Sequence, residues 1–307
     1  MIPLTEGARF KFRPHLAALV ALIACIAIYL WSTPSTVELP KPLRLVTGED
    51  AKTEYLEVPI ATYVHRDGLL KGIKVDFVGA VHLGDRSYYE GLNTRFRGYD
   101  AVLYELVSDG DHVPERGGER TDSLLGSMQR GLSNLLGLTF QLDEIDYRAK
   151  NFIHADLTPD QLRVAMAARG ESLPQLLMKI IKLSTDPEIS KDLQTRQGDD
   201  PLAGLNPLMI ILRGPTADDK LKIRRFMARG LVGSDSVLKL LEGEKGFSLI
   251  TDRNAAVVSV LKREVAAGKR AIAIFYGVGH LPDLHKRLTD ELGLSLQKVE
   301  WVRAWRM

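Results

Sequence analysis

The sequence predicts an α/β fold: a mainly parallel core sheet flanked by helices, with a helical insertion, preceded by one N-terminal transmembrane helix. Three observations support this prediction. Strand-like apolar segments alternate with amphipathic helical segments in two parts of the chain, the part between them shows mostly helical patterns, and a long uncharged run lies near the N-terminus. A chain of 307 residues with 45% hydrophobic composition can bury one sizeable core.

The uncharged run extends from Leu16 to Trp31 and follows three basic residues, Arg9, Lys11 and Arg13. As a helix it would rise about 24 Å, and uncharged flanking residues can complete the crossing of a hydrocarbon core of about 30 Å. Basic residues stay on the cytoplasmic side of a membrane. We therefore expect residues 1–36 to form a cytoplasmic tail and an inner-membrane anchor, and residues 37–307 to form a domain outside the cytoplasm.

Two other fates of this segment stay open. A cleaved signal peptide needs a small-x-small site, and none stands clearly after the apolar run. Leu22-Ile23-Ala24-Cys25 resembles a lipobox, but the residues after Cys25 are apolar where a mature lipoprotein turns polar. Because Cys25 is the only cysteine, a metal site in the domain must use His and carboxylate ligands.

The overall charge argues against a nucleic-acid partner. The 41 basic and 39 acidic side chains nearly cancel, so composition predicts no large field of one sign.

The first α/β part follows an extended linker over residues 37–45. Residues 55–65 and 73–81 predict two strands joined as a hairpin. Residues 85–96 predict a helix, because Tyr88, Tyr89, Leu92 and Phe96 recur at helical spacing. Residues 101–107 predict another strand, so strand, helix and strand indicate a right-handed parallel crossover.

The middle of the chain predicts a helical insertion over about residues 110–246. After a polar loop at residues 109–121, helical patterns alternate with Gly and Pro. The expected helices cover residues 124–138, 159–168, 173–183, 217–228 and 237–241. The α/β pattern then returns with a helix at 252–267, a buried strand at 270–276, a helix at 281–292 and a last strand at 296–301.

Three polar residues fall at predicted strand ends, where ligands bind in parallel sheets. His82 and His280 each follow a strand, and Glu105 lies late in another. Two imidazoles and a carboxylate are a common ligand set for a divalent metal that activates water. Arg253, at the start of a helix, could pair with Glu105 or clamp a substrate anion.

Plain structural interpretations compete with this site. Each histidine could be a buried residue bonded to loop carbonyls, Glu105 could lie on a solvated strand face, and Arg253 could be an ordinary first-turn residue. The shared G-x-x-H spacing of His82 and His280 is weak on its own, because about 0.6 such matches are expected by chance. The motifs of serine hydrolases, zincins and P-loop proteins do not occur in the sequence.

Four motifs together carry a family resemblance. They are Val78-Gly79-Ala80-Val81-His82-Leu83-Gly84-Asp85, Tyr104-Glu105, Asn151-Phe152-Ile153-His154-Ala155-Asp156 and Gly277-Val278-Gly279-His280-Leu281-Pro282. In these motifs the chain resembles the TraB/PrgY/GumN/Tiki family. The resemblance implies a scaffold related to erythromycin esterase-like and haem-binding ChaN-like proteins, and in the Tiki branch a metal-dependent protease.

By position, the resemblance makes His82, Glu105 and His280 metal-binding or catalytic residues and gives Arg253 or Asn254 a supporting role. We expect Asn254 and Asp85 to contact substrate. The expected function is a membrane-anchored hydrolase, specifically a peptidase, that uses Mn²⁺, Co²⁺ or Zn²⁺, with Glu105 as ligand or general base. The alternatives are a non-catalytic protein that sequesters a peptide, haem or another ligand, and a structural or regulatory membrane partner.

Overall fold

The computed structural model describes five main ranges, residues 38–65, 72–109, 131–172, 204–232 and 248–307, together with residues 113–117, 174, 175, 178 and 202. All of them belong to the unit Glu38–Met307. Within these residues no helix is both long and apolar enough to cross a membrane. The predicted anchor at residues 16–31 and Cys25 lie outside the described residues.

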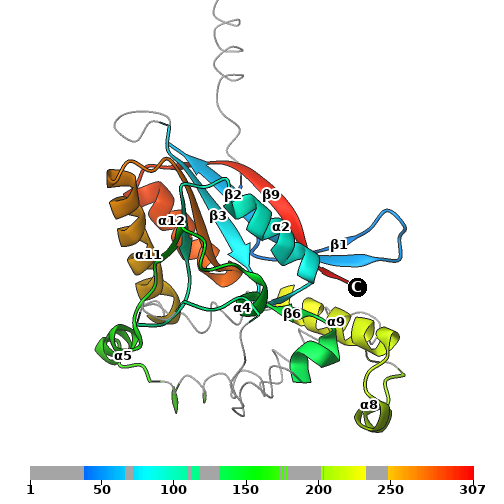
Figure 1. Cartoon of the computed structure of the whole chain (residues 1–307). Coiled ribbons are helices and arrows are strands. Elements are labelled where there is room, and N and C mark those ends of the chain that lie inside the picture. The colour runs from blue at the N-terminus through cyan, green and yellow to red at the C-terminus, as the bar shows by residue number, and fades with distance from the viewer. Residues whose placement is uncertain are drawn as a thin grey trace, which may run out of the picture. The chain divides into compact units, whose positions relative to one another are not determined.

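A central sheet organises this unit (Figure 1). Across the sheet the strand order is β9 (Ser295–Arg306), β2 (Glu54–Val64), β3 (Lys74–Ala80), β8 (Ala271–Gly277), β5 (Ala101–Tyr104) and β7 (Phe152–His154). The strands β3, β8, β5 and β7 run parallel, whereas β2 is antiparallel to β3, to β9 and to the short β1 (Arg44–Thr47). The prediction of a mostly parallel sheet in an α/β fold is confirmed.

Helices cover both faces of the sheet. Ala273 and Phe275 of β8 belong to the cluster that contains α2 (Arg86–Phe96), and the alternate residues Ile272 and Ile274 belong to the cluster with α11 (Ser248–Ala266) and α12 (Leu281–Lys286). This alternation follows from the two-residue period of a strand. The buried run predicted at residues 270–276 is therefore confirmed as a strand with helices on each side.

The predicted helix at residues 85–96 is α2. The four side chains that defined its apolar face are all buried: Tyr88, Tyr89, Leu92 and Phe96. Two of them also tie the helix to the sheet, because the Tyr88 hydroxyl donates to the carbonyl of Gly79 and the Tyr89 hydroxyl to that of Val81. Burying a tyrosine requires such a partner for its hydroxyl group.

The strand β8 lies between β3 and β5, so Glu105 does not follow a direct neighbour of β3. Long-range pairing of this kind leaves no local pattern in the sequence. Because β8 lies in the middle of the sheet, the segment that follows it also starts there. This segment is a short 3-10 helix (η2, Val278–His280) that leads into α12.

The predicted helical insertion over residues 110–246 is only partly helical. It contains α4 (Gln141–Glu144), α5 (Pro159–Ala168), α8 (Pro207–Arg213) and α9 (Ala217–Val232). It also contains β6 (Thr139–Phe140), which pairs with β4 (Leu83–Gly84), and the core strand β7. Strands of two or three half-buried residues are too short for a periodic signal, so they were missed.

Among the predicted helices of this region, α5 matches residue for residue. Thr158 caps it by accepting from the backbone N–H of Gln161, whose side chain accepts from Thr158 in return. The predicted helix at 237–241 and most of that at 173–183 lie outside the described residues. At the C-terminus, β9 is longer than the predicted strand at 296–301, and the predicted helix at 281–292 comprises α12 and a π-helical turn (η3, Arg287–Glu291).

The first motif glycine has a packing role that can be tested. A Cβ atom on Gly79 would lie 2.8 Å from Cγ1 of Val278 and 2.9 Å from the carbonyl oxygen of Pro59. We expect Gly79→Ala to lower the free energy of unfolding by about 1–3 kcal/mol, because the strand must shift to admit the methyl group. Gly91→Ala is the matched control, since on α2 no atom beyond the neighbouring residues and the backbone of the helix lies within 4 Å of its Cβ position.

The Gly91→Ala variant should be neutral or up to about 1 kcal/mol more stable, because alanine favours the helix. Urea unfolding of both variants measures the two effects. Equal midpoints for the two variants would contradict the tight packing assigned to Gly79.

Candidate active site

Five polar side chains meet beyond the carboxyl ends of β5, β7 and β8. They form what we call the Glu105 cluster, which consists of Glu105, Asp156, Arg253, Asn254 and His280. The strands supply Glu105, Asp156 and His280 directly after their ends, and α11 supplies the other two. Ligands of parallel sheets bind at this edge.

Glu105 is the centre of the cluster. Its Oε1 lies 2.7 Å from Nη2 of Arg253 and 3.6 Å from Nε2 of His280, and its Oε2 accepts from the backbone N–H of Gly277 at 2.6 Å. Only 12% of the side chain is exposed, which excludes the solvated strand face as an interpretation. Burial by itself would raise the pKa of Glu105, but His280, Arg253 and the Gly277 N–H outweigh it and hold the pKa well below 4.5.

Arg253 bridges two carboxylates. Its Nε and Nη2 donate to the two oxygens of Asp156 at 2.9 and 2.5 Å, and Nη2 also contacts Glu105. Burial would lower the pKa of Arg253, but the two carboxylates raise it, so the guanidinium stays charged. The sequence allowed two roles for Arg253, pairing with Glu105 or clamping a substrate anion. Arg253 pairs with Glu105, and its charge is shared between Glu105 and Asp156.

Asn254 fixes the protonation of His280. Its Nδ2 donates to Oδ2 of Asp283 at 2.8 Å and to the carbonyl of His280 at 3.3 Å, so this end of the amide is the nitrogen. The Oδ1 of Asn254 must then accept from Nδ1 of His280, 2.6 Å away. Nδ1 therefore carries a proton, and Nε2 is the ring nitrogen on the side of Glu105.

Two predicted site residues, His82 and Asp85, lie outside the Glu105 cluster, and the third, Asn254, belongs to it. The His82 side chain is exposed after β3, and among the described residues no hydrogen bond or ion pair joins it to the Glu105 cluster. Asp85 precedes α2 and accepts from the backbone N–H of Arg306 at 2.6 Å and from Arg224 at 3.3 Å. Asn254 is fully buried and contacts His280 rather than an open cavity.

A metal ion fits this arrangement only in part. The 3.6 Å between Nε2 of His280 and Oε1 of Glu105 is close to the spacing of about 3.4 Å between two ligands of a tetrahedral site. In the described part of the chain, however, no three His, Cys, Asp or Glu side chains are grouped closely enough to hold a metal. The Arg253 guanidinium occupies a position beside Glu105, and His82 does not complete the set.

Asp156 is the residue of the Glu105 cluster that the sequence analysis did not single out. Its side chain is completely buried, and it orients Arg253 through two hydrogen bonds. The available signal was its place two residues after His154, at the end of β7. That signal was hidden because residues 151–156 were assigned to a helical insertion, where no strand end is expected.

No protein-family model, curated protein or solved structure matches the chain. Function is therefore inferred below from the geometry of the Glu105 cluster.

The ionised state of Glu105 predicts a pH-dependent stability. A carboxyl group whose folded-state pKa is depressed stabilises the fold above its unfolded pKa, and this contribution is lost as the pH falls below about 4.5 towards the folded-state value. We expect Glu105→Gln to cost about 2–3 kcal/mol at pH 7, because a charged partner of Arg253 is lost. The difference from wild type should shrink between about pH 5 and pH 3.

Urea unfolding at several pH values measures this difference. Glu90→Gln serves as the control, since Glu90 is an exposed glutamate on α2 and its replacement should shift the midpoints little at any pH. A wild-type to Glu105→Gln difference that stays constant with pH would show that Glu105 is not held ionised.

Proposed function

We propose that the chain is a hydrolase whose active site is the Glu105 cluster. The observation that carries the proposal is the pair formed by His280 and Glu105: the imidazole is oriented by Asn254 through Nδ1, and its Nε2 lies 3.6 Å from Oε1 of a largely buried carboxylate. A carboxylate beside an imidazole stabilises the imidazolium that forms when the ring accepts a proton as a general base.

The residues support a balanced proton path. Nε2 of His280 accepts a proton from a water molecule as the water oxygen attacks a carbonyl carbon. Glu105 stabilises the imidazolium that forms, and Asn254 keeps the ring oriented through Nδ1. The imidazolium then returns the proton to the leaving group. Arg253 acts as a positioning residue, because it holds Glu105 in place and keeps it charged.

A divalent metal, Mn²⁺, Co²⁺ or Zn²⁺, belongs to a second form of the same proposal. His280 and Glu105 would hold it, and His82, which is exposed at the end of β3, stays the proposed third ligand. The ion would supply a bound water of lowered pKa. With the metal bound, Nε2 is a ligand and cannot accept a proton, so the two forms exclude each other and metal content distinguishes them.

The proposed substrate and location rest on the sequence. Peptide bonds are the proposed target, because the G-x-x-H motifs and Glu105 resemble those of the TraB/PrgY/GumN/Tiki family, whose Tiki branch includes a metal-dependent protease. The uncharged run at residues 16–31, with basic residues before it, supports an anchor in the inner membrane and a domain outside the cytoplasm.

A non-catalytic binding protein is the second candidate function. The observation that favours it is the saturation of Arg253, whose charge is shared by Glu105 and Asp156 and is not presented to a substrate. Such a protein would sequester a peptide, haem or another ligand. Haem binding through a histidine would give a Soret band after reconstitution, and the hydrolase proposal predicts none.

Hydrolysis can be tested with a pooled fluorogenic peptide library and a set of activated esters. We expect the purified full-length protein to cleave at least one of them and His280→Gln to lose about 1,000-fold or more in kcat, because the general base is gone. Asn254→Ala should lose about 10–100-fold in kcat with little change in KM, since it only orients the imidazole. His65→Gln, a histidine outside the cluster, is the control.

Unchanged activity in His280→Gln would refute the proposed site. Absence of turnover in the wild type with every substrate, together with ligand capture, would favour the binding protein.

Metal content separates the two forms of the proposal. After dialysis against Mn²⁺, Co²⁺ or Zn²⁺, the metal form predicts about one equivalent of metal in the wild type and in His65→Ala, and none in His82→Ala/His280→Ala. The metal-free form predicts equal, negligible metal in all three proteins. Elemental analysis of the purified full-length chains measures the difference.

A further inference from the structure

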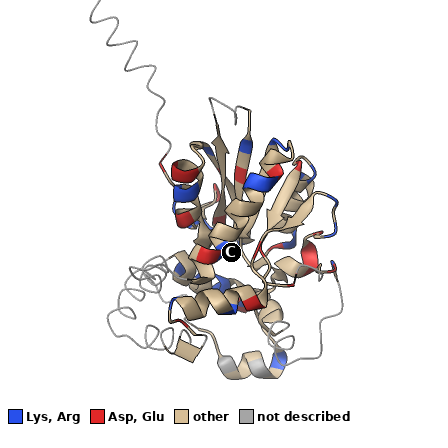
Figure 2. Ribbon diagram, turned by 90° about the vertical axis from the view of Figure 1, so that its left-hand side faces the viewer, with Lys and Arg blue, Asp and Glu red and all other residues tan. Residues whose placement is uncertain are grey.

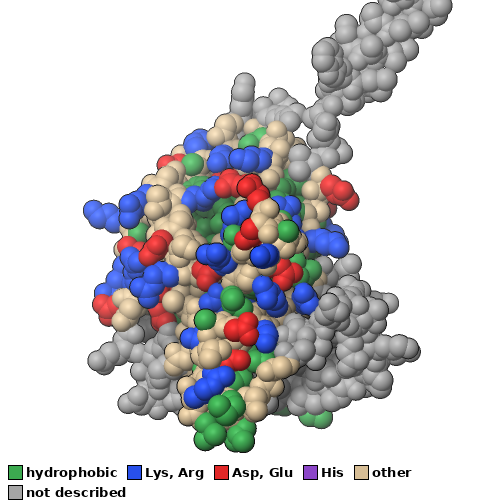
Figure 3. Space-filling model, turned by 90° about the vertical axis from the view of Figure 1, so that its right-hand side faces the viewer, with side chains coloured by type: hydrophobic (Ala, Val, Ile, Leu, Met, Phe, Trp, Pro, Cys, Tyr) green, Lys and Arg blue, Asp and Glu red, His purple; other side chains and the backbone are tan. Residues whose placement is uncertain are grey.

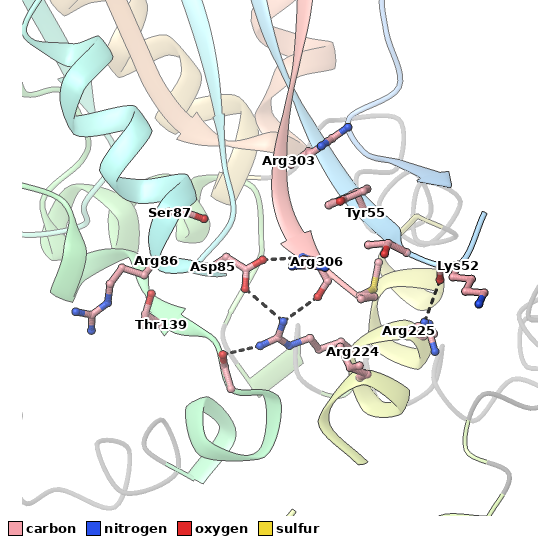
Figure 4. A pocket seen from close by; sticks show the side chains of 14 residues that line it. Lys52, Tyr55, Asp85, Arg86, Ser87, Thr139, Arg224, Arg225, Arg303 and Arg306 are labelled. Carbon is pink, nitrogen blue, oxygen red and sulfur yellow. Dashed lines mark hydrogen bonds and ion pairs between the residues drawn. The ribbon is translucent and has the colours of Figure 1, made fainter. Parts of the chain in front are cut away.

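A basic cleft of about 890 Å³ lies apart from the Glu105 cluster (Figure 4). It is bounded by the start of β2, the end of β9, the first turn of α2 and the helix α9. Six cationic side chains and one carboxylate, Asp85, line it. The cations are Lys52, Arg86, Arg224, Arg225, Arg303 and Arg306. No residue of the Glu105 cluster takes part in the lining.

Arg224 forms part of the structure of the cleft rather than an open binding group. It comes from α9 and its guanidinium donates to the carbonyls of Leu136, Gly137 and Arg306 as well as to Asp85. Figure 4 shows it below Asp85 and Arg306, in contact with both. Its side chain is only 12% exposed, so Arg224 holds the segments that line the cleft together rather than facing a ligand.

The carboxylates near the cleft do not neutralise it. Glu144 pairs with Arg86 at 3.2 Å. Glu54 is shared by Arg225 at 3.0 Å and Arg229 at 3.8 Å, and Glu57 is shared by Arg44 at 2.8 Å and Arg303 at 3.7 Å. One negative charge cannot balance two positive charges. The cleft therefore keeps an excess of positive charge although the whole chain is nearly neutral.

Two of the cations make no close ion pair among the described residues, although Arg306 lies within electrostatic reach of Asp50 and Asp85. The ammonium group of Lys52 and the guanidinium of Arg306 form no ion pair within 4 Å there, and both side chains are exposed. Figure 4 shows Arg86 at one end of the cleft, Lys52 at the other and Arg306 between them. Cations spread along a cleft suit a ligand with more than one anionic group.

The N-terminal end of α2 adds to the positive potential of the cleft. Its first residues, Arg86 and Ser87, line the cleft, and Asp85 makes no side-chain cap to the helix because its carboxylate binds Arg224 and the Arg306 N–H instead. The uncapped N–H groups of this first turn carry partial positive charge. Residues of both signs are interspersed along the ribbon in Figure 2 and over the face drawn in Figure 3.

We propose that this cleft binds a ligand that carries two or more phosphate groups. Guanidinium groups bind phosphate oxygens in pairs of hydrogen bonds, and Lys52 adds a point charge. The phosphates can belong to a soluble phosphorylated compound or to the headgroup of an anionic lipid. The site is independent of the proposed hydrolase, because none of its lining residues belongs to the Glu105 cluster.

Calorimetric titration of the full-length protein in neutral detergent tests this proposal, with inorganic pyrophosphate, inorganic phosphate and citrate as probes. We expect pyrophosphate to bind with a one-to-one stoichiometry, at least about tenfold tighter than phosphate or citrate. Lys52→Gln/Arg306→Gln should weaken pyrophosphate binding by at least about tenfold. The control Arg163→Gln/Lys262→Gln removes the same charge from exposed positions outside the cleft and should change it by less than about twofold.

Two soluble short-chain lipids identify the source of the phosphate. Dihexanoyl phosphatidylinositol bisphosphate, whose headgroup carries several phosphates, that competes with pyrophosphate, while dihexanoyl phosphatidylcholine does not, would assign the cleft to a lipid headgroup. Competition by neither lipid, with pyrophosphate still bound, would assign it to a soluble ligand. The proposal is overturned if pyrophosphate does not bind at millimolar concentration, if citrate binds as tightly, or if the control variant loses as much affinity as the cleft variant.

Discussion

The arrangement of Glu105, Arg253 and Asp156 is the constraint on which the site depends. It joins the ends of β5 and β7 to α11, three segments far apart in the sequence, through contacts of 2.5–2.9 Å. Two carboxylates share one guanidinium, so the buried group keeps one negative charge in excess. Burying that charge is unfavourable without a partner. Nε2 of His280 lies 3.6 Å from Oε1 of Glu105, which explains why a protonated imidazole or a metal ion would be stabilised at this point.

The two glycines of the repeated G-x-x-H spacing have different physical roles. Gly79 is needed for close packing, because Val278 and the Pro59 carbonyl leave no room for a Cβ. Gly277 instead lets Glu105 approach the backbone: its N–H donates to Oε2, and a Cβ there would lie 3.3 Å from the same oxygen. The histidines of the two motifs also differ: His280 is buried and hydrogen-bonded to Asn254, whereas His82 is exposed. Equal motifs therefore do not imply equal functions.

Local patterns predicted most of the core, and long-range pairing limited the rest. The apolar faces of α2 and α5 and the buried run of β8 follow from spacing within one segment, so these elements were predicted from the sequence. The position of β8 between β3 and β5 depends on pairing across 170 or more residues, as between Val102 and Ala273, and no local signal records it. The sequence analysis placed Glu105, Arg253 and His280 at one edge of the sheet. It did not include Asp156, because β7, the strand before Asp156, is only three residues long and gives no periodic signal.

Charge is distributed oppositely at two places in this unit. At the Glu105 cluster the carboxylates outnumber the guanidinium groups, whereas in the basic cleft the cations outnumber the carboxylates. Both imbalances are built around an arginine that is already fully engaged, Arg253 in one and Arg224 in the other. Each arginine thereby fixes geometry, while neighbouring groups set the net charge. A formal charge of +2 for the whole chain conceals this separation, because the two local excesses have opposite signs. The cluster is thus suited to protons or cations and the cleft to anions, so their ligands need not compete.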